Sequence, residues 1–177
     1  MPTYLMDALK KGYTIDIEDF MEKAGSDIMQ DSLRELQRLL NTEIPITRHF
    51  HLTVGAYNER MLRLDAPLAE NVNHAGTAFG GSLSALLTLA GWSMLWFMLQ
   101  EYGLQGEIII QDSTCRYLAP VTKDFSAYCY RPSNEQLGRF EKMLRTHRKG
   151  RLELMADIRE GDIQAVSFAG RYVVRLF

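Results

Sequence analysis

Residues 71–100 read NVNHAGTAFGGSLSALLTLAGWSMLWFMLQ, a short polar loop followed by a long apolar segment. No charged residue occurs between Ala75 and Gln100. Such a segment is either enclosed on nearly every side by the rest of the chain or surrounded by lipid. The choice between these two environments decides the fold.

The apolar segment is a poor match to a membrane span, which needs about 20 consecutive apolar residues. Its strictly apolar part, Leu83 to Leu99, is shorter and contains serine, threonine and glycine. The glycine-rich stretch before it lacks the basic or aromatic anchors that are typical of a membrane interface. We therefore expect a helix buried within a sheet, and no membrane span.

Length and charge limit the classes of protein to consider. A chain of 177 residues is long enough for one domain with a single core. Its formal net charge of -2 argues against a nucleic-acid-binding domain, which is typically strongly basic. The first residues lack the basic-then-apolar pattern of a secretory signal, so a cytoplasmic location is expected.

A metal site is not predicted. His49 and His51 would share one face of a strand, but the sequence places no third ligand beside them. Cys115 and Cys129 lack metal-ligand spacing and are expected to be buried free thiols.

Hydrophobic periodicity predicts the elements around the apolar helix. Spacings of three and four predict further helices over about 17–40 and 134–147. Alternation of apolar and polar residues predicts strands over 49–56, 61–66, 107–118, 124–131, 151–159 and 166–174. Strands joined by short turns favour an antiparallel sheet. The predicted fold class is α+β, a curved antiparallel sheet wrapped around one long central helix. Residues 1–30 would form an amino-terminal arm and helix extension, and residues 31–177 the domain.

The start of the apolar helix could hold an anionic oxygen, because a helix amino terminus offers unpaired N–H groups and a positive dipole end. Gly80 and Gly81 would let a substrate approach this backbone, although close packing of helix on sheet would also need glycine. The Asn73 amide could donate to such an oxygen or simply close a turn. Thr77 and Ser82 could line the pocket or cap the helix.

Asp112 is the best remaining acid. In the strand over 107–118 it is expected to share a face with Ile108 and Ile110. If that face points inward, Asp112 could act as a base. Pairing with Arg116 is the alternative.

Several spaced motifs carry a family resemblance. They are APLAENVN (66–73), GT (76–77), FGGS (79–82), LAGW (89–92) and DSTCRYLAP (112–120). Together with the order of elements they resemble hot-dog acyl-thioester enzymes. More narrowly, they are similar to the group long labelled putative thioesterases, which includes proteobacterial malonyl-acyl-carrier-protein decarboxylases. The resemblance covers about Ser32 to Val174.

This resemblance implies decarboxylation of malonyl-acyl carrier protein to acetyl-acyl carrier protein, which feeds the initiation of fatty-acid synthesis. Asn73 and Gly81 would be catalytic, and Gly80, Thr77 and Ser82 would contact the substrate. A large hot-dog thioesterase group has His-Gly-Gly and an acid nine residues later. Here Phe79 and Thr88 occupy those two positions.

Two other functions stay open: an acyl-CoA or acyl-carrier-protein thioesterase that uses Asp112 as acid or base, and a non-catalytic acyl-thioester-binding module. No cofactor is expected, because the substrate itself carries phosphopantetheine or coenzyme A. The resemblance also implies a homodimer or a dimer of dimers.

A local group of basic residues could attract the acidic carrier protein or the phosphates of coenzyme A. The solvated face of a helix is the alternative. The group consists of Arg139, Lys142, Arg145, Arg148, Lys149 and Arg151.

Overall fold

A computed structural model describes residues 17–177, with side chains described from residue 26 onward. The predicted arm over residues 1–16 lies outside the described residues. The helices are α2 (Ile17–Glu43), α3 (Ile46–His49), α4 (Gly80–Glu101) and α5 (Asn134–His147), with a 3-10 turn, η1, at Ala69–Asn71. The strands are β1 (Thr53–Tyr57), β2 (Met61–Ala66), β3 (Gly106–Tyr117), β4 (Phe125–Tyr130), β5 (Lys149–Glu160) and β6 (Ile163–Leu176).

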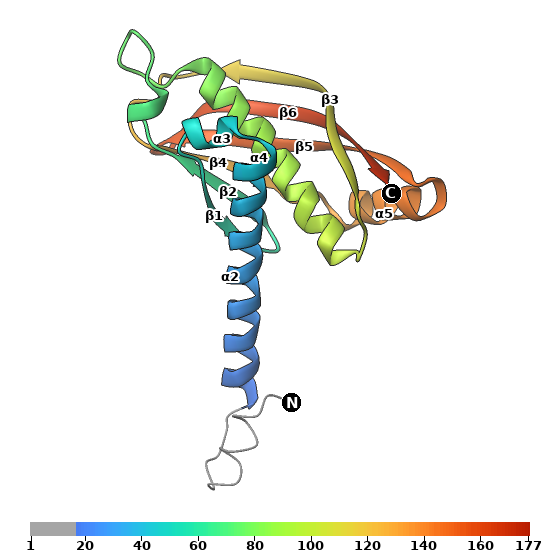
Figure 1. Cartoon of the computed structure of the whole chain (residues 1–177). Coiled ribbons are helices and arrows are strands. Elements are labelled where there is room, and N and C mark those ends of the chain that lie inside the picture. The colour runs from blue at the N-terminus through green and yellow to red at the C-terminus, as the bar shows by residue number, and fades with distance from the viewer. Residues whose placement is uncertain (1–16) are drawn as a thin grey trace, which may run out of the picture.

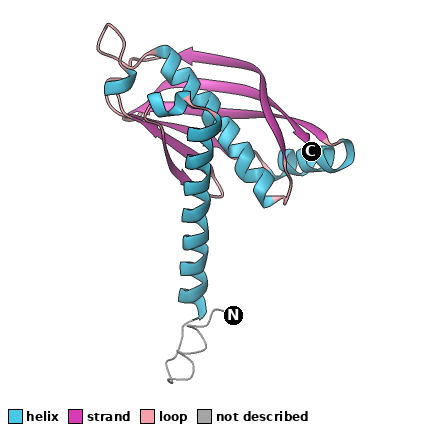
Figure 2. Cartoon of the chain, viewed as in Figure 1, coloured by secondary structure: helices cyan, strands magenta, loops and turns pink. Residues whose placement is uncertain are grey.

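The six strands form one sheet in the order β1-β2-β4-β5-β6-β3, and every neighbouring pair is antiparallel. The sheet curves, and α4 lies along its inner face (Figures 1 and 2). This arrangement confirms the predicted α+β hot-dog architecture. Two strands are left at the edges of the sheet: β1, which has five residues, and β3, which has twelve.

Helix α4 is the core of the protein. It is long and apolar enough to cross a membrane, but 78% of its most apolar window is buried within the protein. Leu87, Ala90, Met94, Leu95 and Met98 are fully buried. The sheet therefore supplies the apolar surroundings that a helix without charged residues requires.

Helix α2 covers one end of the domain with its carboxyl-terminal part. Leu36 and Leu40 are fully buried there, and the Gln37 side chain bonds to backbone groups of Leu52 and Val54 at 3.0 and 2.7 Å. The amino-terminal half of α2 extends away from the sheet (Figure 1).

The strand predicted over 49–56 is wrong in its first half. Residues 46–49 form α3, which follows Pro45, and β1 begins only at Thr53. His51 lies between them with a positive φ of 51°. His49 and His51 therefore do not share a strand face, and the described residues contain no cluster of metal-ligating side chains.

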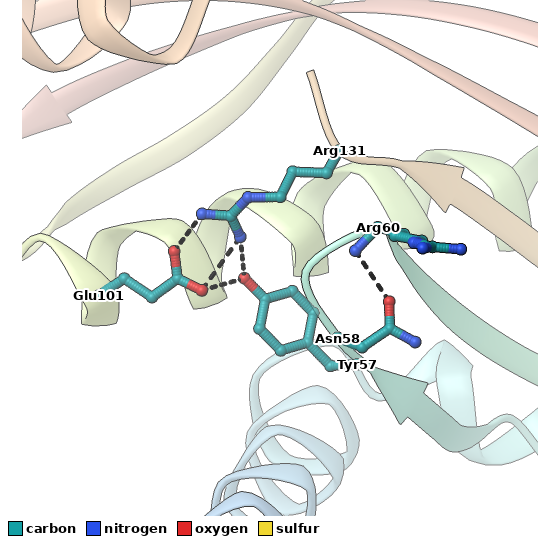
Figure 3. Close-up of polar contacts among 5 residues, drawn as sticks. All are labelled: Tyr57, Asn58, Arg60, Glu101 and Arg131. Carbon is teal, nitrogen blue, oxygen red and sulfur yellow. Dashed lines mark hydrogen bonds and ion pairs between the residues drawn. The ribbon is translucent and has the colours of Figure 1, made fainter. Parts of the chain in front are cut away.

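A polar cluster fixes the far end of α4 (Figure 3). Arg131 forms a bidentate ion pair with Glu101, and its Nη1 also donates to the Tyr57 hydroxyl at 2.6 Å. Tyr57 in turn donates to Glu101, while its ring stacks on Phe97 with centroids 3.9 Å apart. These contacts join β1, the carboxyl end of α4 and the residue that follows β4.

Candidate active site

The amino terminus of α4 carries free hydrogen-bond donors. Phe79 is its N-cap residue, with extended backbone and no side-chain cap. The first helical bond runs from the Leu83 N–H to the Phe79 carbonyl oxygen at 3.0 Å. The N–H groups of Gly80, Gly81 and Ser82 have no acceptor among the described residues. Unpaired N–H groups at the positive end of a helix dipole can stabilise an anionic oxygen.

The expectation that Thr77 or Ser82 caps this helix is wrong. Neither side chain bonds to the first turn of α4. Thr77 lines the pocket beside the helix, whereas Ser82 is buried and is not among the residues that line it.

Two aromatic rings flank the glycines. The Tyr117 hydroxyl donates to the Gly80 carbonyl oxygen at 2.9 Å, and its ring lies 3.4 Å from the position that a Cβ atom would take at Gly80. The Phe79 ring lies only 2.2 Å from the corresponding position at Gly81. Partial burial raises the pKa of the Tyr117 hydroxyl, so it remains a donor at neutral pH. A side chain at Gly81 would displace the Phe79 ring.

A pocket of about 400 Å³ opens beside Gly80, whereas Gly81 and Ser82 are not among the residues that line it. Its lining consists of Thr77, Ala78, Gly80, Leu83, Tyr117, Leu118, Ala119, Pro120 and Val121. A second pocket of about 340 Å³ follows the same helix, between α4, α3 and β3. Both volumes lie within the range of small-molecule sites. Among the described residues, none that lines either pocket is an Asp, Glu, His, Lys or Arg.

Asn73 holds the loop before the helix. Its Oδ1 accepts from the N–H groups of Ala75 and Thr77 at 2.8 and 3.3 Å. Its Nδ2 donates to Thr77 Oγ1 at 2.9 Å and to the Ala78 carbonyl oxygen at 3.3 Å. The amide is therefore engaged within its own turn, beside a residue that lines the pocket.

Asn71 has a structural role that reaches beyond its own turn. Its side chain is 2% exposed, and Nδ2 donates to the carbonyl oxygens of Phe50 and Pro67 at 2.9 and 2.8 Å. Its own carbonyl oxygen accepts from the Phe79 N–H at 2.7 Å. Asn71 thus connects three segments and fixes the residue at which α4 begins.

Asp112 lies on the outer face of the sheet. The register of β3 and β6 shifts between Ile110 and Asp112, so Asp112 is opposite the exposed Arg171. Ile110 is opposite the buried Tyr172 on the inner face. The prediction that Asp112 shares a face with Ile110 is wrong because this β-bulge reverses the alternation. No ion pair joins Asp112 to Arg116 among the described residues.

Sequence reasoning also missed Tyr117 and the segment Leu118–Val121 as parts of the site. They lie in the DSTCRYLAP motif and just after it, so a signal was present. The alternation of β3 did not show that Tyr117 points inward, because the bulge at Gln111 shifts the phase of the strand.

Solved structures share this fold. A Chlorobaculum tepidum TLS protein of unknown function, OLEI01261, is 28% identical with a TM-score of 0.79, covering 83% of this chain and 96% of that one. A putative thioesterase from Shewanella oneidensis is 29% identical with a TM-score of 0.72, covering 82% of this chain and 98% of its own. PA5026 of Pseudomonas aeruginosa, at 21% identity and a TM-score of 0.70, covers 81% of this chain and 95% of its own and supports the fold alone.

A family match agrees with these structures and covers most of the chain, from residue 33 to residue 176. It includes the loop with Asn73, the first turn of α4 and the whole of β3. The chain belongs to the family Putative thioesterase (yiiD_Cterm), whose hot-dog proteins are linked to acyl-thioester chemistry.

Proposed function

We propose that this protein decarboxylates malonyl-acyl carrier protein to acetyl-acyl carrier protein, and so supplies a primer for fatty-acid synthesis. One observation carries the proposal: Gly80, which has a free N–H group, lines a pocket that has no Asp, Glu, His, Lys or Arg in its lining. Hydrolysis needs a group that activates water. Decarboxylation needs only a stabilised enolate oxygen and a poorly solvated carboxylate.

The reaction balances without a cofactor. The bond between the α-carbon and the terminal carboxylate breaks, and carbon dioxide leaves. The electron pair of that bond forms the enolate, whose negative charge rests on the thioester oxygen. The N–H groups of Gly80 and Gly81 donate to this oxygen, and a proton from solvent then adds to the α-carbon. Because no lining residue is a cation, the substrate carboxylate gains no ion pair that would oppose its loss.

Asn73 is proposed to act beside these donors. To contact the thioester oxygen or the malonyl carboxylate, its amide would exchange the bond to Thr77 Oγ1 or to the Ala78 carbonyl oxygen for a bond to substrate. Thr77 contacts the substrate from the pocket wall, and Ser82 contributes its backbone N–H.

The decisive variants are at Gly80. Proline is tolerated at the first helical position, where it removes only an N–H group that makes no helical bond. Phe79 already has the extended backbone, with φ -67° and ψ 128°, that a residue before proline prefers. Gly80→Pro should lower kcat for malonyl-carrier protein about 100-fold, the usual effect of losing one oxyanion donor.

Gly80→Ala is the matched control, because it keeps the N–H group and places its Cβ in ordinary contact with the Tyr117 ring. It should retain kcat within a few-fold. The assay follows both the mass of the acyl-carrier protein and the release of free thiol. Loss of carbon dioxide with the thioester intact supports the proposal, and equal activity of the two variants would contradict the role of the N–H group.

Thioester hydrolysis is the second candidate, supported by the family description and the Shewanella oneidensis neighbour. It would need a base from outside the described pocket lining, since Asp112 lies on the outer face. Free thiol in the assay would support it. A non-catalytic binding module would give neither product; Trp92 does not fill the pocket, because its Nε1 donates to the Ile108 carbonyl oxygen at 3.1 Å.

The active protein is proposed to be a cytoplasmic homodimer formed through β3. This edge strand has twelve residues and one unpaired side, whereas β1 has five residues and lies beside α2. A long unpaired edge is a template for pairing with another strand. Ile109 and Tyr117 on this strand are 44% and 54% exposed in the single chain. A dimer of dimers would need a further interface.

A further inference from the structure

Four cations form an unneutralised basic surface: Arg148, Lys149, Arg151 and Arg175. None has a carboxylate within ion-pair distance among the described residues. Two other members of the basic group identified in the sequence, Arg139 and Arg145, each pair with a glutamate one helical turn earlier in α5. Arg139 pairs with Glu135 at 2.6 Å, and Arg145 pairs with Glu141 at 2.7 Å.

The basic surface lies at the end of the sheet where β3 begins. Lys149 is opposite Arg175, and Arg175 is opposite Glu107 of β3. Arg151 lies two residues after Lys149 on β5, on the same outward face of the sheet. Its Nε donates to Gln111 Oε1 at 3.3 Å. The first row contains two cations, Lys149 and Arg175, and one acid, Glu107. Together with Arg151 and Arg148 this makes four cations against one acid.

The candidate active site lies at the opposite end of β3. Tyr117, the last residue of this strand, bonds to Gly80. The twelve residues of β3 span about 36 Å at roughly 3.3 Å per residue. A phosphopantetheine arm has the length of about five extended residues, or roughly 18 Å. A carrier protein docked on the basic surface could therefore not reach the pocket of the same chain.

Antiparallel pairing of two β3 edges would bring the basic surface of one subunit close to the pocket of the other. In a two-fold dimer it brings the Gly106 end of one strand beside the Tyr117 end of the other. Arg175 then lies two strand spacings from the partner strand, about 10 Å away. The arm can cross this distance around the strand ends.

We propose that the basic surface of one subunit docks the acidic face of malonyl-carrier protein and delivers the malonyl group to the pocket of the partner subunit. The inference rests on the proposed function and on the β3 dimer. Opposite charges would steer the carrier to this surface. Each active site is then served in trans.

Charge reversal tests the docking surface. Lys149→Glu with Arg175→Glu should raise KM for malonyl-carrier protein roughly tenfold or more, within the range of electrostatic steering. It should leave kcat/KM for malonyl-pantetheine, which lacks the carrier, unchanged. The matched control, Arg38→Glu with Arg60→Glu, changes net charge equally at two exposed cations elsewhere. An equal effect of both pairs, or an effect on malonyl-pantetheine, would overturn the docking surface.

Mixed dimers test delivery in trans. Two subunits with different affinity tags are co-expressed, and the mixed dimer is purified on both tags. One mixed dimer carries the charge reversal on one subunit and Gly80→Pro on the other; trans delivery predicts about half of wild-type activity. A second carries both changes on one subunit beside a wild-type subunit; with both dimers assayed at carrier concentrations well below KM, trans delivery predicts that it has about a tenth of the first dimer's activity. Delivery in cis predicts the reverse result, which would overturn the proposal.

Failure of this inference differs from failure of the proposed function. If wild-type protein releases no carbon dioxide from malonyl-pantetheine or malonyl-carrier protein, the proposed function fails. If the protein releases carbon dioxide but is a monomer by light scattering, or if the mixed dimers show the activities expected for delivery in cis, the proposed decarboxylase activity is retained and delivery in trans is wrong.

Discussion

The Tyr117 hydroxyl donates to the Gly80 carbonyl oxygen at 2.9 Å, and this bond ties the last residue of β3 to the first residue of α4. The two residues are 37 positions apart in the chain. Because Gly80 carries one of the free N–H groups, the bond controls the position of the proposed oxyanion donors. Sheet and helix are thus coupled at the point where chemistry is proposed.

Tyr117→Phe should separate this positioning from packing. The ring stays and only the bond is lost, so unfolding free energy should fall by about 1 kcal/mol or less at this half-exposed site. We expect kcat to fall several-fold with little change in KM, because the donors lose alignment but remain present. Steady-state kinetics and urea unfolding measure both quantities. Tyr128→Phe on β4, away from the pocket, is the control, and an unchanged kcat in Tyr117→Phe would contradict the positioning role.

Two helical glycines should respond to alanine with opposite signs. A Cβ atom at Gly91 would lie 2.2 Å from the hydroxyl of Tyr172, which is fully buried and donates to the Thr88 carbonyl oxygen at 2.8 Å. Gly91→Ala should therefore lower stability by about 1–3 kcal/mol through overpacking. A Cβ atom at Gly138 in α5 meets no atom within 4 Å. Gly138→Ala should raise stability by about 0.5–1 kcal/mol. Urea unfolding of both variants checks the difference, and two changes of equal sign would contradict it.

The fold was predictable where local pattern and burial agree. The alternation in β5 and β6 predicted the inward row that includes Leu154, Ile158 and Val174, and all three are buried. The charge-free stretch predicted α4, and Gly103, with a φ of 62°, follows the end of this helix. These features depend only on residues that are close in the sequence and on a regular pattern of apolar residues.

The site was less predictable because its geometry depends on contacts between distant segments. One extra residue in β3 moved Asp112 to the outer face, and no alternation pattern shows a bulge. Asn71 and Asn73 have the same side chain two positions apart, yet only Asn71 meets Phe50 and Pro67. The sequence indicated a candidate loop before α4, but not which neighbours each of its side chains would contact.

This contrast predicts different phenotypes for the two asparagines. Asn71→Ala leaves the part-buried carbonyl oxygens of Phe50 and Pro67 without this donor and should lower stability by about 2–3 kcal/mol. Asn73 is partly exposed, so Asn73→Ala should cost about 1 kcal/mol or less while abolishing most decarboxylation. Urea unfolding and product mass measure the two effects. Equal loss of stability in both variants, with proportional loss of activity, would mean that Asn73 only supports the loop.

Asn73→Asp refines the test of the second asparagine. An aspartate keeps the acceptor for the Ala75 and Thr77 N–H groups but cannot donate to Thr77 Oγ1 or to the substrate. If the loop structure alone matters, Asn73→Asp should retain more activity than Asn73→Ala. If donation to substrate matters, both variants should be equally inactive.

The cluster at the other end of α4 predicts a pH dependence of stability. Burial alone would raise the pKa of Glu101. Hydrogen bonds from Arg131 and Tyr57 lower it by more than burial raises it, so the pKa lies below the usual 4.5. A lowered pKa in the folded protein stabilises the fold above pH 4.5, and this contribution is lost as pH falls through the folded value. Glu101→Gln should therefore be less stable than wild type at pH 7, and the difference should shrink towards pH 3. Urea unfolding at both pH values measures it, with Glu59→Gln in the exposed β1–β2 turn as control. A difference that stays constant across this range would show that Glu101 acts through packing, not through its charge.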